Sequence, residues 1–205
     1  MNLTIFLHRF WKSIEMYPRS LHQANSLLPG MGAASILDHE ILIQEYPFKP
    51  SVAYPELTLK ASQIRALGLE FGPCRIYHNE DIIFISRQHK AALEAFAQRN
   101  QIALRPHSWN WDWLLEPYLD TELSPENKEN IRQRLLENGF HPEEVARIRA
   151  EVGPQMQHYN FDTGLWEWVS LGLFDVLCAM HAAYSDGDFQ DFYQRALAKD
   201  QRKSR

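Results

Sequence analysis

The first half of the chain alternates between short apolar runs and turn-forming residues. Apolar residues recur at helical spacing over residues 3–15, which predicts an amphipathic helix. Short apolar or alternating runs then predict strands, and the two runs around residues 78–81 predict a hairpin. The expected strands span residues 41–46, 56–60, 64–71, 75–77, 82–85 and 102–104.

One helix is expected to cover these strands. Residues 87–99 place Leu93 and Phe96 on one helical face, and Ser86 stands where an N-cap is expected. Asn100 suits the left-handed conformation that ends many helices. The first half of the chain therefore predicts several antiparallel strands followed by one helix that packs on them.

From residue 106 onward the pattern is helical. Ser108 precedes a short segment that Pro117 should end or bend. Ser124 and Ser185 precede two longer helical segments, and serine is among the residues preferred at the N-cap. The second half of the chain therefore predicts a helical unit.

Two further helices are expected between these serines. The pair Gly153-Pro154 predicts that the first of them ends near residue 152, because proline cannot donate a hydrogen bond to the preceding turn. The second spans residues 165–184 and is apolar on nearly all sides. Such a helix must be covered on several sides, so the two halves of the chain are expected to form one cooperative unit.

This order of elements predicts an α+β fold. The expected architecture is a small antiparallel sheet with a covering helix, followed by an all-helical subdomain packed against it. The boundary falls near residue 105. Residues 1–105 then hold the N-terminal helix and the sheet unit, and residues 106–205 hold the helical subdomain.

Composition excludes several classes of protein. The chain has 205 residues, of which 45% are hydrophobic and 23% charged, with two cysteines and a net charge of −5. These values exclude an intrinsically disordered chain, a disulfide scaffold and a strongly basic nucleic-acid-binding protein. The charge is uneven, because residues 1–105 carry +2 and residues 106–205 carry −7. The helical half is therefore acidic.

The sequence predicts a soluble cytoplasmic protein without a nucleic-acid or membrane partner. No apolar run reaches the roughly 18 residues that a membrane span needs, and no small-residue cleavage site follows the N-terminal segment. Cys74 and Cys178 are expected to be reduced core thiols. Neither the spacing of a zinc site, nor a phosphate-binding loop, nor a nucleophile motif is present, so no catalytic residue, metal or cofactor is predicted.

Three of the six tryptophans lie within five residues, at positions 109, 111 and 113. On a helix, Trp109 and Trp113 share one face and Trp111 points to the other side. Two interpretations remain open. The segment could be wedged between the sheet and the helical unit. Alternatively, at least one tryptophan could be an exposed anchor for a partner or an apolar ligand, because tryptophan is enriched at binding hot spots.

Three acidic residues overlap this segment. Asp112, Glu116 and Asp120 are four residues apart, so a continuous helix would align them in one stripe, although Pro117 disfavours helix at that point. The stripe could be a solvated acidic face, a surface for a basic partner, or a metal or acid–base site. The last of these needs more oxygen ligands than the pattern supplies.

We expect a non-catalytic interaction or regulatory protein that binds a protein partner through its acidic helical half. One alternative is an enzyme without a local motif, such as a hydrolase that uses acids together with His107. A second alternative is a small-ligand or lipid-binding module with a cavity between the two halves. The candidate contact residues are Trp109, Trp111, Trp113, Asp112, Glu116 and Asp120.

Overall fold

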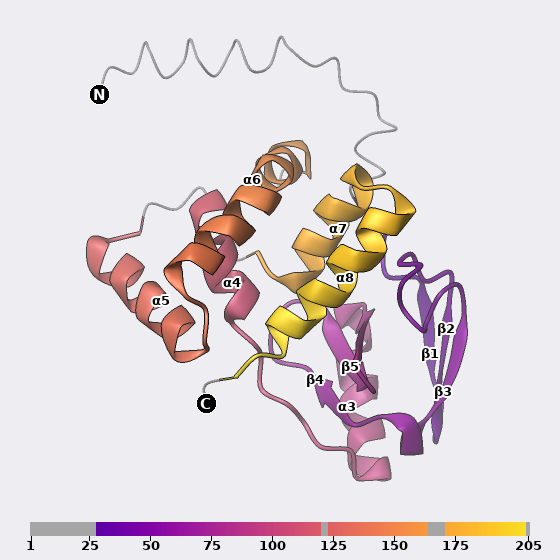
Figure 1. Cartoon of the computed structure of the whole chain (residues 1–205). Coiled ribbons are helices and arrows are strands. Elements are labelled where there is room, and N and C mark those ends of the chain that lie inside the picture. Colours follow the sequence, from indigo (N-terminus) through magenta and orange to yellow (C-terminus); the bar gives the residue numbers. More distant parts are fainter. Residues whose placement is uncertain (1–27, 120–122, 164–170, 204–205) are drawn as a thin grey trace.

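The computed structural model describes residues 28–119, 123–163 and 171–203, with the side chains of residues 160–163 left undescribed (Figure 1). The helix expected over residues 3–15 lies outside these ranges. Strands fill the first part of the described chain and helices fill the second, so the fold is α+β as predicted.

The strands form two antiparallel sheets where one was expected. The first sheet has the order β1-β2-β3, and the second has the order β4-β5-β6. Strands β2 to β6 overlap the predicted segments, and β5 and β6 form the predicted hairpin. The strand bounds are β1 Ala33–Ile36, β2 Glu40–Gln44, β3 Leu57–Lys60, β4 Ala66–Gly68, β5 Cys74–His78 and β6 Asp81–Ile85.

Strand β1 was not predicted, because its sequence Ala-Ala-Ser-Ile has no apolar run and follows a glycine. Among the described residues it is an edge strand that pairs with β2 alone. The strand expected over residues 102–104 is reduced to a single parallel bridge between Leu67 and Leu104. Both differences depend on which segments pair with each other. A local sequence pattern does not show this pairing.

Helix α3 (Lys90–Asn100) follows the short 3₁₀ turn η2 (Arg87–His89). Ser86 stands at the N-cap position of this turn, as predicted, but its side chain makes no capping hydrogen bond. The predicted end is displaced by one residue, since Gln101 adopts the left-handed conformation with a φ of 56°. Asn100 instead stays helical, and its amide group donates to the carbonyls of Phe96 and Asp38.

The helical part begins with α4 (Asn110–Leu115) and the 3₁₀ turn η3 (Glu116–Tyr118). Pro117 ends the α-helical conformation at this point, as predicted. Helices α5 (Pro125–Glu137) and α8 (Asp186–Asp200) begin at the predicted serine caps, because the Ser124 side chain accepts from the N–H of Asn127 and the Ser185 side chain accepts from that of Asp188.

Two predicted helix boundaries in this part are wrong. Helix α6 (Pro142–Thr163) continues through Gly153 and Pro154 rather than ending at residue 152. Helix α7 (Leu173–Ala183) begins eight residues later than the expected start at residue 165, because Gly172 is in an extended conformation. In the described part of α7, six residues are buried, in agreement with the predicted apolar helix.

The core joins the sheets to the helices. Figure 1 shows α7 and α8 between the second sheet and α6, and all five residues of β6 are buried. Asp81 in β6 accepts hydrogen bonds from the hydroxyls of Tyr193 in α8 and Ser51. Arg75 in β5 forms a buried ion pair of 3.0 Å with Asp200 at the end of α8. Within the described ranges, every helix is too short or too polar to cross a membrane.

Candidate functional site

The tryptophan segment is divided between the core and the surface. Trp111 is only 1% exposed, and its indole N–H donates to the carbonyl of Ala196 in α8 at 3.0 Å. Trp113 is partly buried against the core. Trp109 is 39% exposed and packs against the rings of Phe71 and His107. Of the three candidate anchors, Trp109 therefore presents the most surface to a partner.

The predicted acidic stripe is not continuous. The Asp112 carboxylate lies 3.0 Å from the His107 ring nitrogen Nε2, and both side chains are largely buried. Glu116 belongs to η3, and its carboxylate lies 3.9 Å from the guanidinium of Arg149. Asp120 is outside the described residues. The structure therefore places the two described acids beside different partners, His107 and Arg149, instead of aligning them on one solvated face.

His107 and Asp112 meet, as an acid–base site would require, but the neighbouring groups are already engaged. The Ser108 hydroxyl donates to the carbonyl of Asp200 at 2.6 Å. The main-chain N–H of His107 donates to the Glu70 carboxylate. The third candidate of the hydrolase hypothesis, Glu116, lies with Arg149 and not with this pair. Within the described residues, no group of three His, Cys, Asp or Glu side chains is arranged to hold a metal ion.

Asp175, at the start of α7, is a second carboxyl group with polar partners close to Asp112. Its carboxylate accepts hydrogen bonds from the N–H of Gly172 at 2.8 Å and from the hydroxyl of Tyr159 at 3.2 Å. Although part of the residue remains accessible, the protein packed around its carboxyl raises the pKa of Asp175 to about 6. The negative charge of Asp112 acts in the same direction. These contacts tie α6 to the start of α7.

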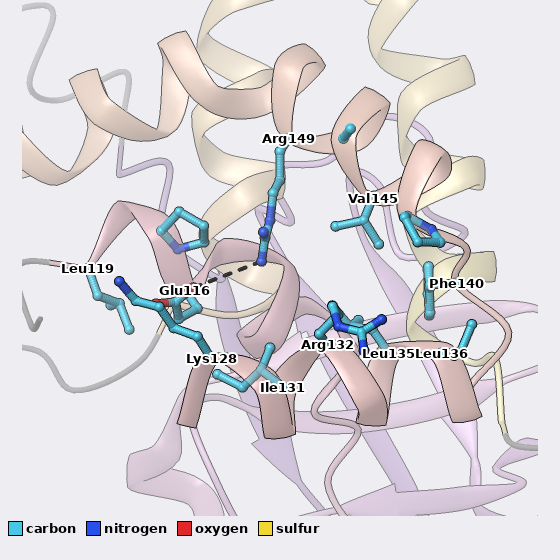
Figure 2. Close-up of a pocket in the computed structure, with 13 residues that line it drawn as sticks. Glu116, Leu119, Lys128, Ile131, Arg132, Leu135, Leu136, Phe140, Val145 and Arg149 are labelled. Atoms are coloured by element: carbon cyan, nitrogen blue, oxygen red, sulfur yellow. Dashed lines mark ion pairs between the residues drawn. The ribbon is translucent and has the colours of Figure 1, made fainter. Parts of the chain in front are cut away.

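A groove lies between α5 and α6 and is bounded at one end by η3 (Figure 2). We call it the α5–α6 groove, and its volume is about 670 Å³. It lies within the helical part of the chain, whereas a cavity between the two halves was considered from the sequence. Its larger apolar lining residues are Leu119, Ile131, Leu135, Leu136, Phe140 and Val145.

The α6 side of the groove is held in place by contacts from Arg149. Its guanidinium donates to the carbonyls of Trp113 and Leu114, each at 3.0 Å, and so caps the last turn of α4. The hydroxyl of Tyr118 donates to the main-chain carbonyl of Arg149 at 2.6 Å, which fixes η3 against α6. These hydrogen bonds fix η3 and the last turn of α4 against α6.

The α5 side is anchored mainly at its C-terminal end. Leu135 and Phe140 are buried, and the amide of Asn138 donates to the side-chain oxygen of Asn110 at 2.7 Å. The guanidinium of Arg202 lies 4.0 Å from the centre of the Phe140 ring. By contrast, residues 124–130 are all exposed. The N-terminal half of α5 is therefore a groove wall with little packing behind it.

The charge of the groove is opposite to that of the helical half. Three lining residues are cations, namely Lys128, Arg132 and Arg149, and Glu116 is the one carboxylate among the lining residues. Residues 106–205 as a whole carry −7. Figure 2 shows Lys128 near the Leu119 end, Arg132 in the middle and Arg149 reaching down from α6. Cations are thus distributed along an otherwise apolar groove.

The sequence does not show this groove, because the apolar residues of α5, at positions 131, 135 and 136, are spaced as one buried helical face would be. Leu135 is buried, but Leu136 next to it is 37% exposed. The available signal was this adjacent pair on an otherwise polar helix, since neighbouring residues on a helix point about 100° apart and one of them can face away from the core. Which of them faces a groove depends on the angle between α5 and α6, which the sequence does not contain.

Comparisons of the chain with protein-family models, with curated proteins and with solved structures give no match.

Proposed function

We propose that this chain is a non-catalytic interaction protein whose α5–α6 groove binds the apolar face of a helix from a protein partner. The observation that carries this proposal is the groove itself, in which apolar side chains from α5, α6 and η3 line one concave surface of about 670 Å³. Exposed apolar surface of this kind is typical of binding sites, because its removal from water stabilises a complex.

The walls of the groove favour a helix over an extended peptide. Both α5 and α6 use their main-chain groups within their own helices, so the walls offer no strand edge to a partner. An extended peptide would lose its main-chain hydrogen bonds to water without replacing them, whereas a helix carries its own. A helix with an apolar stripe can therefore enter an apolar groove at a lower cost in free energy than an extended peptide can.

The polar groups of the groove support binding rather than catalysis. Glu116 is paired with Arg149, whose guanidinium also caps α4. The other charged lining residues, Lys128 and Arg132, are exposed on α5, and Arg132 bonds to Glu129. The lining residues therefore include neither a hydroxyl or thiol nucleophile nor a histidine to activate one.

Trp109 and Phe71 support a second candidate surface. Their rings lie 4.9 Å apart and both are substantially exposed. The guanidinium of Arg87 donates to the carbonyls of Glu70 and Gly72 on either side of Phe71, which holds this aromatic pair in place. Exposed aromatic rings are typical of hot spots, so this pair is the alternative binding surface, separate from the groove.

A displayed library of helical peptides tests the main proposal. Each peptide carries one apolar stripe and variable flanking positions, and the library is selected against the full chain. We expect binders that lose affinity for the variant Ala146→Trp, because Ala146 is exposed in the groove and a tryptophan there fills it. The matched control is Ala92→Trp, at an exposed alanine on α3 outside the groove. Selected helices that bind both variants equally well contradict the proposal.

A further inference from the structure

The charges around the α5–α6 groove indicate which kind of helix it accepts. Lys128 and Arg132 are four residues apart, so they lie on one face of α5, about 6 Å apart at their Cβ atoms. Arg149 faces them from α6. The groove therefore presents cations from both of its long walls, one helical turn apart along α5.

Among the described residues, the cation on the α6 wall has one loosely placed carboxylate partner, Glu116. Burial lowers the pKa of Arg149, which reflects the cost of holding its charge away from water. Its nearest carboxylate, Glu116, lies 3.9 Å away, and its short hydrogen bonds go to neutral carbonyls. A carboxylate brought by a partner would offset this charge more effectively than the carbonyls do.

The internal pairing of Arg132 does not remove the positive character of the groove. Glu129 bonds to Arg132 at 2.8 Å, but Glu129 does not line the groove. Glu129 and Arg132 are both more than half exposed, so a partner carboxylate can compete for the guanidinium at little cost. Lys128 lines the groove at the end that η3 bounds, near Leu119 and Glu116.

We infer that the partner helix is acidic, with carboxylates one turn apart beside its apolar stripe that face Lys128 and Arg132, and a further carboxylate that faces Arg149. This inference rests on the proposed function, since it names the partner of the same groove. The distribution of the cations distinguishes this partner from a fatty acid, whose single carboxylate can meet one cation while the others stay unpaired. The same groove cations also disfavour binding of a basic helix, because like charges repel.

The test uses a helical peptide library with a fixed leucine stripe, in which each flanking position is glutamate, glutamine or lysine. The library is selected against the full chain, with and without Ala146→Trp. We expect enrichment of glutamate at flanking positions one turn apart, and the enriched peptides should bind less tightly as salt rises. Groove-dependent enrichment of lysine or glutamine overturns the inference and leaves the proposed function intact. Loss of all groove-dependent binding overturns both.

Charge reversal on α5 gives a second readout. The double variant Lys128→Glu with Arg132→Glu should weaken binding of the glutamate-flanked peptide by about tenfold or more and strengthen binding of a lysine-flanked peptide. The matched control is Arg134→Glu, because Arg134 is exposed on the same helix and does not line the groove. An equal effect of both variants overturns the inference. Sodium oleate that displaces every peptide whatever its flanking charge also overturns it, in favour of a lipid ligand.

Discussion

The hydroxyl of Tyr118 lies 2.6 Å from the main-chain carbonyl of Arg149, one turn before Pro154 in α6. This hydrogen bond fixes η3, which bounds the groove, against the helix that forms its long wall. The approach requires a glycine, since a Cβ atom added at Gly153 would lie 2.8 Å from the Tyr118 hydroxyl oxygen. Gly153 therefore sits inside α6 to admit Tyr118, and not to end the helix.

Gly153→Ala tests this relationship. Alanine in place of glycine stabilises an ordinary helix interior by about 1 kcal/mol, but here the added methyl group meets the hydroxyl, so we expect a net loss of stability. In a Tyr118→Phe background the hydroxyl is absent, and the same substitution should be neutral or stabilising. Urea unfolding of the four proteins measures the coupling. Equal effects of Gly153→Ala in both backgrounds would contradict the assigned contact.

Arg149→Met removes the donors that cap the last turn of α4. Two carbonyls then lose a charged partner, and we expect a loss of about 2 kcal/mol in the free energy of unfolding. The control is Arg134→Met, where the exposed pair with Glu137 should contribute less than about 1 kcal/mol. Similar values for the two variants in urea unfolding would show that the capping interaction contributes little.

Two single substitutions distinguish the buried tryptophan of this segment from the exposed one. Trp111→Ala removes a buried side chain and its hydrogen bond, and we expect a loss of about 3–5 kcal/mol. Trp109→Ala removes a surface ring that packs against Phe71 and His107, and a loss of about 1 kcal/mol or less is expected. Thermal unfolding followed by circular dichroism distinguishes them. A larger effect at Trp109 than at Trp111 would contradict the placement of the two side chains.

Because the pKa of Asp175 is raised in the folded protein, we expect the free energy of unfolding to depend on pH. Its pKa is about 6 in the folded protein and close to 3.8 when unfolded, so between these values the folded state binds more protons. Its contribution to stability is thus complete below about pH 4 and is lost as the pH rises to about 6. Relative to the wild type, Asp175→Asn should gain about 1–3 kcal/mol between pH 4 and pH 7.

The measurement is chemical unfolding of both proteins across this range of pH. Other carboxyls act in the opposite direction, since hydrogen bonds from Arg195 and Arg202 lower the pKa of Glu151 and Glu144. The difference between Asp175→Asn and the wild type cancels these shared contributions. A difference that does not change with pH would contradict the raised pKa of Asp175.

Features that depend on neighbouring residues in the chain were predictable from the sequence. The caps at Ser124 and Ser185 each need only a serine and an N–H three residues later, and both are present. The hairpin of β5 and β6 follows from two apolar runs around a polar turn. The break at Pro117 follows from the missing N–H of proline.

Features that depend on distant residues were not predictable. Helix α6 passes through Gly153 and Pro154, where Tyr118 from η3 packs against the helix. The sequence could not show whether Trp111 is buried, because its indole N–H bonds to the carbonyl of Ala196, 85 residues away. The groove was missed for the same reason, since it exists only where α5 diverges from α6.

The most direct test of the account asks where a selected acidic helix contacts the chain. Methyl and indole NMR signals are followed while the peptide is added to the full-length protein. We predict shifts at the methyl groups of Ile131, Leu136 and Val145, which line the groove, without shifts at the Trp109 indole or the exposed methyl groups of Leu104. Shifts at Trp109 and Leu104 with unchanged groove signals would contradict the account and place the binding site on the aromatic surface.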